Sequence, residues 1–422
     1  MRKIVWLLVV IAGILWALPD KTIAGSFTYS DLIYAIAFII VIFENLVFKR
    51  PLIILLNKRY SVIFYILLFT GIGAMTGMIR SSDTIGASVA FLQYAFIFVV
   101  VLTVIHYLIN NKMENALKVL VIFTIPGIIS GVMVSLSGLG FVTAYDSQLL
   151  YGLGRYRGFN GSLPTAYGAQ TVLACVIIYM MFRISKRFIN KLFWFTMLLV
   201  CVYAIILTAS FGAIIMLGLA ISLIWWFFSK HTLLTRSLLV FAFCAGLSVF
   251  YSHQTGNYQY MNYLPDIVKI RVEAAGGEFG SADVRSELNR LGVEKFFENP
   301  LMGIGHTQFM YHNPHGRVVH NTIISAAVES GVFGLIGVVL YLIVPIVLAY
   351  RMVKAKLFDA KSYEGVMVRF LLVYLLIRLA QTTTSHEYIE RNLWLPGLVV
   401  FVIYATQMNR KEKAISQVGQ PV

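Results

Sequence analysis

The sequence predicts an all-α polytopic membrane protein with about twelve transmembrane helices. Of its 422 residues, 59% are hydrophobic and only 13% are charged, whereas a soluble domain carries roughly a quarter charged residues. Apolar runs of about 18 residues or more recur along the whole chain, and each is long enough to cross a bilayer as a helix. Short basic clusters separate these runs, as expected of a multi-pass protein.

The apolar runs locate the expected spans. They cover residues 4–18, 29–48, 60–79, 85–109, 116–141, 165–182, 192–208, 211–228, 233–251, 322–350, 366–384 and 393–408. The first run resembles a signal peptide, but the many spans after it favour an uncleaved helix. The expected organisation is a bundle of spans one to nine within 1–251, with a short outer loop at 142–164. This bundle is followed by a long outer loop at 252–319, spans ten to twelve within 320–408 and a tail at 409–422.

The basic residues predict the orientation of these spans. When loops are assigned alternately to the two sides, one side receives Arg2, Lys3, Lys49, Arg50, Lys58, Arg59, Lys112, Lys118, Arg183, Lys186, Arg187, Lys191, Lys230, Arg236, Arg351, Lys354, Lys356, Lys361, Arg410, Lys411 and Lys413. The positive-inside rule therefore predicts cytoplasmic termini and a location in the cytoplasmic (inner) membrane. Topology and contact with anionic membrane lipids account for the net charge of +15, so no nucleic-acid partner is expected.

An amphipathic helix is expected inside the long outer loop. In "SADVRSELNRLGVEKFFENP", Val284, Leu288 and Leu291 follow helical spacing, Ser281 suits the N-cap and Pro300 closes the segment. If this apolar stripe packs onto the outer ends of the membrane helices, it holds Arg285 over the membrane surface. A solvated loop charge, or an ion pair with Glu287, is the alternative for this arginine.

Four basic side chains are expected on the outer face: Arg155, Arg157, Arg285 and His320. Arginine suits bidentate recognition of phosphate and keeps its proton. Histidine is the side chain most easily poised as a base near neutral pH. These residue types indicate a phosphorylated lipid donor, with the histidine deprotonating an acceptor.

Three motifs carry a resemblance to a known family. "NPLMGIG" at 299–305 is followed by "HN" at 320–321, nine further residues, and then Gly331 and Gly334. "RYRGFNGSLPTAYGA" at 155–169 lies before the sixth span. With an arginine-bearing amphipathic segment before "PLxGxG" and the acidic Glu329 after "HN", the pattern resembles the O-antigen ligase and polymerase superfamily.

The resemblance implies glycosyl transfer on the outer face of the cytoplasmic membrane. The donor would be a glycan on a polyprenyl diphosphate such as undecaprenyl diphosphate, and a glycan or lipid-linked acceptor would attack with inversion. His320 would act as general base or position the acceptor, Arg285 would hold the diphosphate, and Arg155 or Arg157 would be a second phosphate clamp. No metal or other cofactor is implied. A chain-length regulator or a flippase would be a protein partner.

One departure bears on the choice within the superfamily. Many ligases carry "TxSRG" between the seventh and eighth spans, whereas this chain has "TASFGA" at 208–213, with Phe211 in the arginine position. The loss of this arginine favours a polymerase, while the unequal loop sizes and the "HN" motif favour a ligase. Both activities therefore stay open. A twelve-span secondary transporter and a lipid-linked glycan flippase are the rival classes. The first usually has charges deep in several spans, and the second needs a cationic cavity through the membrane.

Further candidates have a structural alternative beside the functional one. Asn321 of the "HN" pair and Glu329 are candidate substrate contacts, although a carboxyl in a span could equally make a structural hydrogen bond. Arg378 in span eleven is expected to face an external cavity and bind the donor. A plain solvated loop is expected at His306, His312, His315 and Arg317, and the alternative is that they line the acceptor path.

Overall fold

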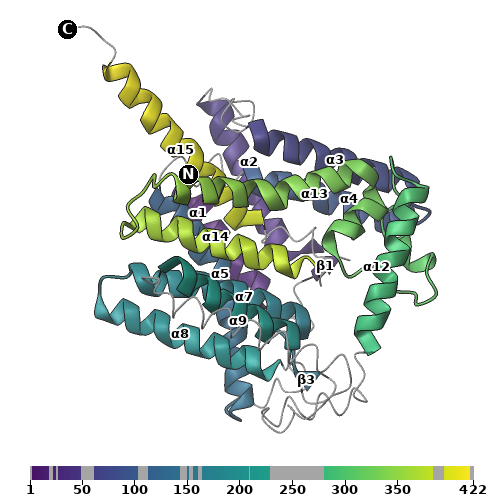
Figure 1. Ribbon diagram of the computed structural model, residues 1–422, viewed down its shortest axis with the longest axis horizontal. Helices are drawn as coiled ribbons and strands as arrows, with labels where there is room; N and C mark the ends of the chain where they lie inside the picture. The colour runs from purple at the N-terminus through teal and green to yellow at the C-terminus, as the bar shows by residue number, and fades with distance from the viewer. Residues whose placement is uncertain are drawn as a thin grey trace. The chain divides into compact units, whose positions relative to one another are not determined.

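The computed structural model describes residues 2–18, 22–24, 27–48, 61–102, 113–142, 150–151, 155–159, 164–208, 210–228, 280–383 and 394–418. In this part of the chain, nearly all regular structure is helical, with two short hairpins (Figure 1). The predicted all-α class is therefore confirmed for these residues, the hairpins aside.

The bounds of the described elements are as follows. The α-helices are α1 (Arg2–Ala17), α2 (Tyr29–Val47), α3 (Ser61–Arg80), α4 (Thr84–Leu102), α5 (Met113–Gly138), α7 (Pro164–Ile184), α8 (Phe188–Leu207), α9 (Phe211–Phe228), α12 (Gly280–Glu298), α13 (Thr322–Lys354), α14 (Tyr363–Gln381) and α15 (Leu395–Val418). A 3-10 helix, η5, covers Phe309–Tyr311, and the strands are β1 (Thr22–Ala24), β2 (Phe27–Thr28), β3 (Leu150–Tyr151) and β4 (Arg155–Tyr156).

Eleven of the twelve predicted spans coincide with these helices, and the ninth, 233–251, lies outside the described residues. Within the described ranges, six helices are long and apolar enough to cross a membrane: α2, α3, α5, α7, α8 and α13. The described parts of α1, α4, α9 and α15 are apolar but shorter. Large apolar side chains are exposed on several of these helices, among them Phe43 on α2 and Leu199 on α8. Lipid rather than water suits such surfaces, so the chain is a membrane protein.

The chain forms two compact units. The first contains residues 1–16, 21–123 and 287–422, and the second contains 17–20 and 124–286. In the first unit α13 packs against α3, α14 and α15, and in the second α7 packs against α8 and α9. Glycines bring α3 and α13 close together, because a Cβ added to Gly73 would lie 2.5 Å from the backbone nitrogen of Gly334.

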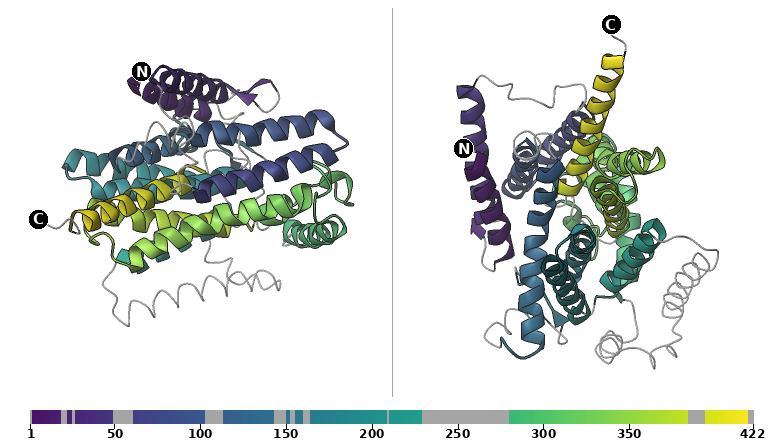
Figure 2. Two further views of the ribbon diagram at one scale, coloured as in Figure 1. Left: turned by 90° about the horizontal axis from the view of Figure 1, so that it is seen from above. Right: turned by 90° about the vertical axis from the view of Figure 1, so that its left-hand side faces the viewer.

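The helix predicted in the outer loop is α12, and from Glu287 onwards it belongs to the first unit. Leu288 is fully buried, whereas Val284 and Leu291 are half-buried. Gly292 faces Val319 and Ile324, close enough that an added Cβ would lie 2.8 Å from Ile324 Cγ2. Figures 1 and 2 show α12 lying across the end of α13. This helix therefore packs on the end of a membrane helix, which was the condition set for Arg285 to be held there.

Candidate functional site

The backbone of α13 is broken nine residues after its first residue. Gly331 has φ 66° and ψ −159°, a conformation that is essentially restricted to glycine. The Val332 N–H donates to the Pro300 carbonyl at 2.8 Å, and the Val328 carbonyl accepts from the Ile304 N–H at 2.8 Å. In an unbroken helix these two α13 groups would bond to each other. The loop 300–304 is therefore inserted into the helix and takes over both of its freed backbone groups.

The glycines of two separate motifs make this insertion fit. A Cβ on Gly331 would collide with the Leu301 carbonyl, and one on Gly303 (φ 71°) would lie 2.6 Å from the Val328 carbonyl oxygen. A Cβ on Gly305 (φ 106°) would lie 2.7 Å from the backbone nitrogen of Ser81, which directly follows α3. "PLMGIG" and the first glycine of "GxxG" therefore form the two sides of one local structure.

The inserted loop carries His306 into the interior of the first unit. Its side chain is 0% exposed, and its N–H donates to the Gly77 carbonyl at 3.0 Å. The imidazole Nε2 lies 3.0 Å from the Ala74 carbonyl oxygen, and the ring stacks on Tyr94 with centroids 5.4 Å apart. The prediction of a solvated loop at His306 is therefore wrong. Gly77 explains the burial, because a Cβ there would lie 2.7 Å from Nε2.

His306 pairs with Glu329, which is only 6% exposed: Nδ1 lies 3.4 Å from Oε2. Because a carbonyl oxygen can only accept, the hydrogen bond to Ala74 places a hydrogen on Nε2. Nδ1 then either accepts from a protonated carboxyl or, in an imidazolium, donates to a carboxylate. Both arrangements leave the pair without net charge, which makes its burial acceptable.

His320 and Asn321 lie where α13 begins. Asn321 is the N-cap, and its side-chain oxygen accepts from the N–H groups of Ile323 at 3.0 Å and Ile324 at 3.1 Å. His320 is half-buried. The Thr322 N–H donates to the Thr382 carbonyl at 2.9 Å, so the start of α13 is bonded to the end of α14.

Arg378 lies one turn before Thr382 on α14, with its backbone near the same end of the first unit as His320. Its side chain is buried within the first unit, with 3% of its surface exposed. The structure thus brings the backbones of His320, Asn321 and Arg378 to one end of the α13–α14 pair.

Arg285 lies on α12, two residues before Glu287, and is half-buried. Desolvation by burial lowers the pKa of its guanidinium, although an arginine keeps its proton under any ordinary condition. Glu287 forms its ion pair with His315, at 2.7 Å, rather than the alternative pair with Arg285. His312 and Arg317 in the same loop are exposed, as predicted.

Arg155 and Arg157 lie in the second unit, on β4 and directly after it. β4 pairs antiparallel with β3, matching Leu150 with Tyr156. Phe159, two residues after Arg157, packs into a buried cluster that includes Tyr167 and Leu207, so this stretch is fixed to α7 and α8. Arg157 itself is half-buried, and Phe211 is the first residue of α9.

These observations define a class of protein: a helical membrane protein in which a loop is inserted into a broken span. The family model for the O-antigen ligase matches residues 195–339, from α8 into α13. The predicted resemblance to the O-antigen ligase and polymerase superfamily is thereby confirmed. No curated protein matches the chain significantly.

The matched range includes Arg285, His306, His320, Asn321 and Glu329, whereas Arg155, Arg157 and Arg378 lie outside it. Among the residues that the structure describes, no three His, Cys, Asp or Glu side chains gather as a metal site would require. Sequence reasoning missed the interior position of His306. The available signal was its place directly after "GIG", because closely spaced glycines indicate a close approach of backbones.

Proposed function

We propose that the chain transfers a glycan from a polyprenyl diphosphate to an acceptor hydroxyl at the outer face of the cytoplasmic membrane. The family match supports a membrane enzyme of the glycan ligase or polymerase kind. The observation that carries the proposal is the insertion of the "PLMGIG" loop into α13. This insertion fixes the start of α13, where His320 lies, with α12 packed across the same end.

Each predicted residue has a role in this reaction that its surroundings suit. His320, half-buried at the entrance of α13, takes the proton from the acceptor hydroxyl. The acceptor oxygen then bonds to the anomeric carbon as the bond from that carbon to the diphosphate oxygen breaks. The leaving diphosphate keeps the electron pair, and Arg285 stabilises its charge. Because the Arg285 guanidinium is partly desolvated, its attraction for an anion is stronger than in bulk water.

The remaining candidates divide into contacts and supports. Asn321 uses its side-chain oxygen as a helix cap, which leaves its NH2 group to donate to substrate. Glu329 holds the inserted loop through His306, and this contact favours a supporting role for it. Arg155 and Arg157 are proposed as further phosphate contacts, and Arg378 as a donor-binding residue. The chemistry requires no metal.

Polymerase and ligase differ in the acceptor, and each remains a form of the same proposal. A polymerase joins one lipid-linked chain to another lipid-linked repeat unit, whereas a ligase moves the chain to a different acceptor, such as a lipid A core. The shared step is the loss of the polyprenyl diphosphate. The rival classes, a secondary transporter and a flippase, move their substrate without breaking that bond.

The test is complementation of a strain lacking this gene at matched protein levels. The variants are His320→Ala and Arg285→Ala, with Arg290→Ala as the control. Arg290 lies on the same helix but is exposed and pairs with Glu294, so its loss should cost at most about 1 kcal/mol. Surface polysaccharide and accumulated polyprenyl-diphosphate glycan are measured together.

The proposal predicts that both site variants lose surface polymer and accumulate lipid-linked glycan in the outer leaflet, while the control keeps polymer. Accumulated single repeat units indicate a polymerase, and full-length unattached chains indicate a ligase. Glycan that accumulates only in the inner leaflet supports the flippase instead. Wild-type behaviour of both variants would make the site assignment wrong and favour the transporter.

A further inference from the structure

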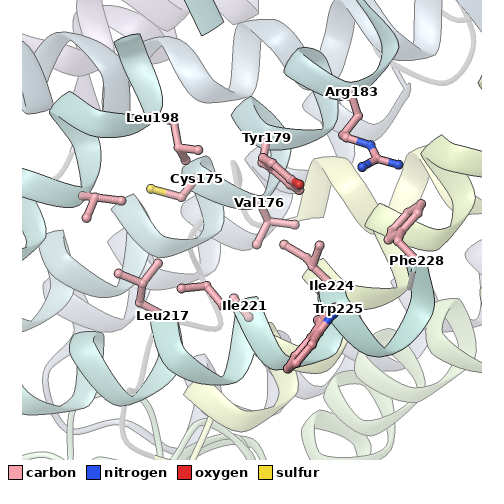
Figure 3. A pocket seen from close by; sticks show the side chains of 12 residues that line it. Cys175, Val176, Tyr179, Arg183, Leu198, Leu217, Ile221, Ile224, Trp225 and Phe228 are labelled. Atoms are coloured by element: carbon pink, nitrogen blue, oxygen red, sulfur yellow. The ribbon is translucent and has the colours of Figure 1, made fainter. Parts of the chain in front are cut away.

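The second unit contains a pocket that none of the proposed catalytic residues lines. It lies between α7, α8 and α9 and has a volume of about 460 Å³ (Figure 3). Its walls are mostly apolar, with Val176 on α7, Leu198 on α8 and Leu217 and Ile221 on α9. The size and lining suit a flexible hydrocarbon chain.

One end of this pocket is cationic and aromatic. Arg183 lies over the Phe228 ring, with the guanidinium carbon 5.7 Å from the ring centroid, and Trp225 lies nearby on α9. Figure 3 shows Cys175 and Leu198 at the opposite end. A tryptophan and an arginine at one end of an apolar cavity are typical of the level where lipid headgroups meet the hydrocarbon.

The charged side chains that the described segment 164–228 contributes near that end are all positive. Arg183, Lys186, Arg187 and Lys191 lie within nine residues at the junction of α7 and α8, and residues 164–228 contain no Asp or Glu. Lys186 and Arg187 are exposed. No carboxylate of this segment competes with an external anion for these cations. The predicted orientation places them at the cytoplasmic surface, where anionic phospholipids are found.

We propose that this pocket binds an anionic phospholipid of the cytoplasmic leaflet, with one acyl chain between α7, α8 and α9 and the phosphate at Arg183. A basic pocket between membrane helices on the cytoplasmic side is a general means of binding such headgroups. The polyprenyl donor is a poor fit, because its diphosphate is proposed to bind at the other membrane surface. The exclusion of the polyprenyl donor rests on the proposed function, whereas the lining and charge of the lipid site do not.

Native mass spectrometry of the purified chain tests the selectivity. The protein is equilibrated with equal amounts of phosphatidylglycerol and phosphatidylcholine, and the retained lipid is identified. Arg183→Gln should lower the retained phosphatidylglycerol about fivefold, the effect of losing about 1 kcal/mol of attraction to one cation. The control Lys354→Gln makes the same charge change at the predicted cytoplasmic end of α13. Because Lys354 does not line the pocket, this variant should leave retention unchanged.

Two further measurements test the position of the lipid. Ala220 lines the pocket and is buried, so Ala220→Phe should fill the space and displace the lipid. If that variant does not fold, phosphatidylglycerol brominated on its acyl chain is added to the wild type. It should quench a tryptophan emission component that is absent in Trp225→Phe.

Three results would overturn the proposal. They are equal retention of both phospholipids by the wild type, a bound mass equal to a polyprenyl phosphate, and no retained lipid at all. The last result would mean that the chain itself, for example its apolar segment 233–251, fills the pocket.

Discussion

Substitution of Gly331 by Ala tests whether the inserted loop depends on the break in α13. Alanine at φ 66° and ψ −159° costs about 1–3 kcal/mol of backbone strain. Its Cβ would also collide with the Leu301 carbonyl, which threatens the bonds from Val332 to Pro300 and from Ile304 to Val328. At about 0.5–1.5 kcal/mol for each bond, the total loss is about 2–6 kcal/mol.

Hydrogen exchange of the Ile304 amide in lipid nanodiscs measures this loss directly. At a factor of ten per about 1.4 kcal/mol, its exchange should accelerate roughly thirtyfold to twenty-thousandfold. Gly218→Ala is the matched control, because Gly218 lies exposed within α9 with open space around it, and there alanine should stabilise by up to about 1 kcal/mol. Unchanged exchange at Ile304 in Gly331→Ala would refute the reasoning.

Three further substitutions test the surroundings of the site. His306→Ala removes the imidazole that pairs with Glu329 and should lower the free energy of unfolding by about 3–5 kcal/mol. The double variant His306→Leu with Glu329→Leu should regain most of this stability, as measured by thermal unfolding. Additive losses from the two substitutions would contradict the pairing. Gly292→Leu should push α12 away from Ile324 and reduce glycan transfer at an unchanged protein level. The control Val293→Leu, at an exposed position, should leave transfer unchanged. Equal transfer by both variants would contradict a role for α12. Asn321→Ala should lose about 0.5–2 kcal/mol of helix capping. Asn321→Asp should restore that stability but not the transfer rate, and full activity of Asn321→Asp would limit Asn321 to the cap.

The fold class could be predicted because apolar runs of membrane length leave few alternatives to helices. Helix ends were less predictable. The last span was expected to end at 408, where the apolar run stops, but α15 continues to Val418. The end of an apolar run marks the end of the hydrocarbon, whereas a helix continues while its residues favour it, as the lysines, glutamate and glutamine of this segment do.

The candidate site could be predicted only in part, because local sequence does not reveal which distant segment a loop contacts. The polar residues after His306 are typical of a solvated turn, and the glycines before it indicate a close approach of backbones without identifying the partner segment. Its burial depends on Gly77 on α3 and on Glu329 on α13, more than twenty residues away in either case. The cost of a carboxyl at Glu329 was correctly anticipated, but the partner that offsets it was not.

The length of α13 also sets its register against the bilayer. Its 33 residues extend about 50 Å, whereas the hydrocarbon core is about 30 Å thick. If Arg351, in the last turn, marks the inner boundary of that core, the outer boundary falls about 20 residues earlier, at Gly331. The first turns of α13, with Glu329, then lie among the outer headgroups. The phosphates of membrane lipids are found at that depth. The break in α13 then coincides with the outer boundary of the hydrocarbon core.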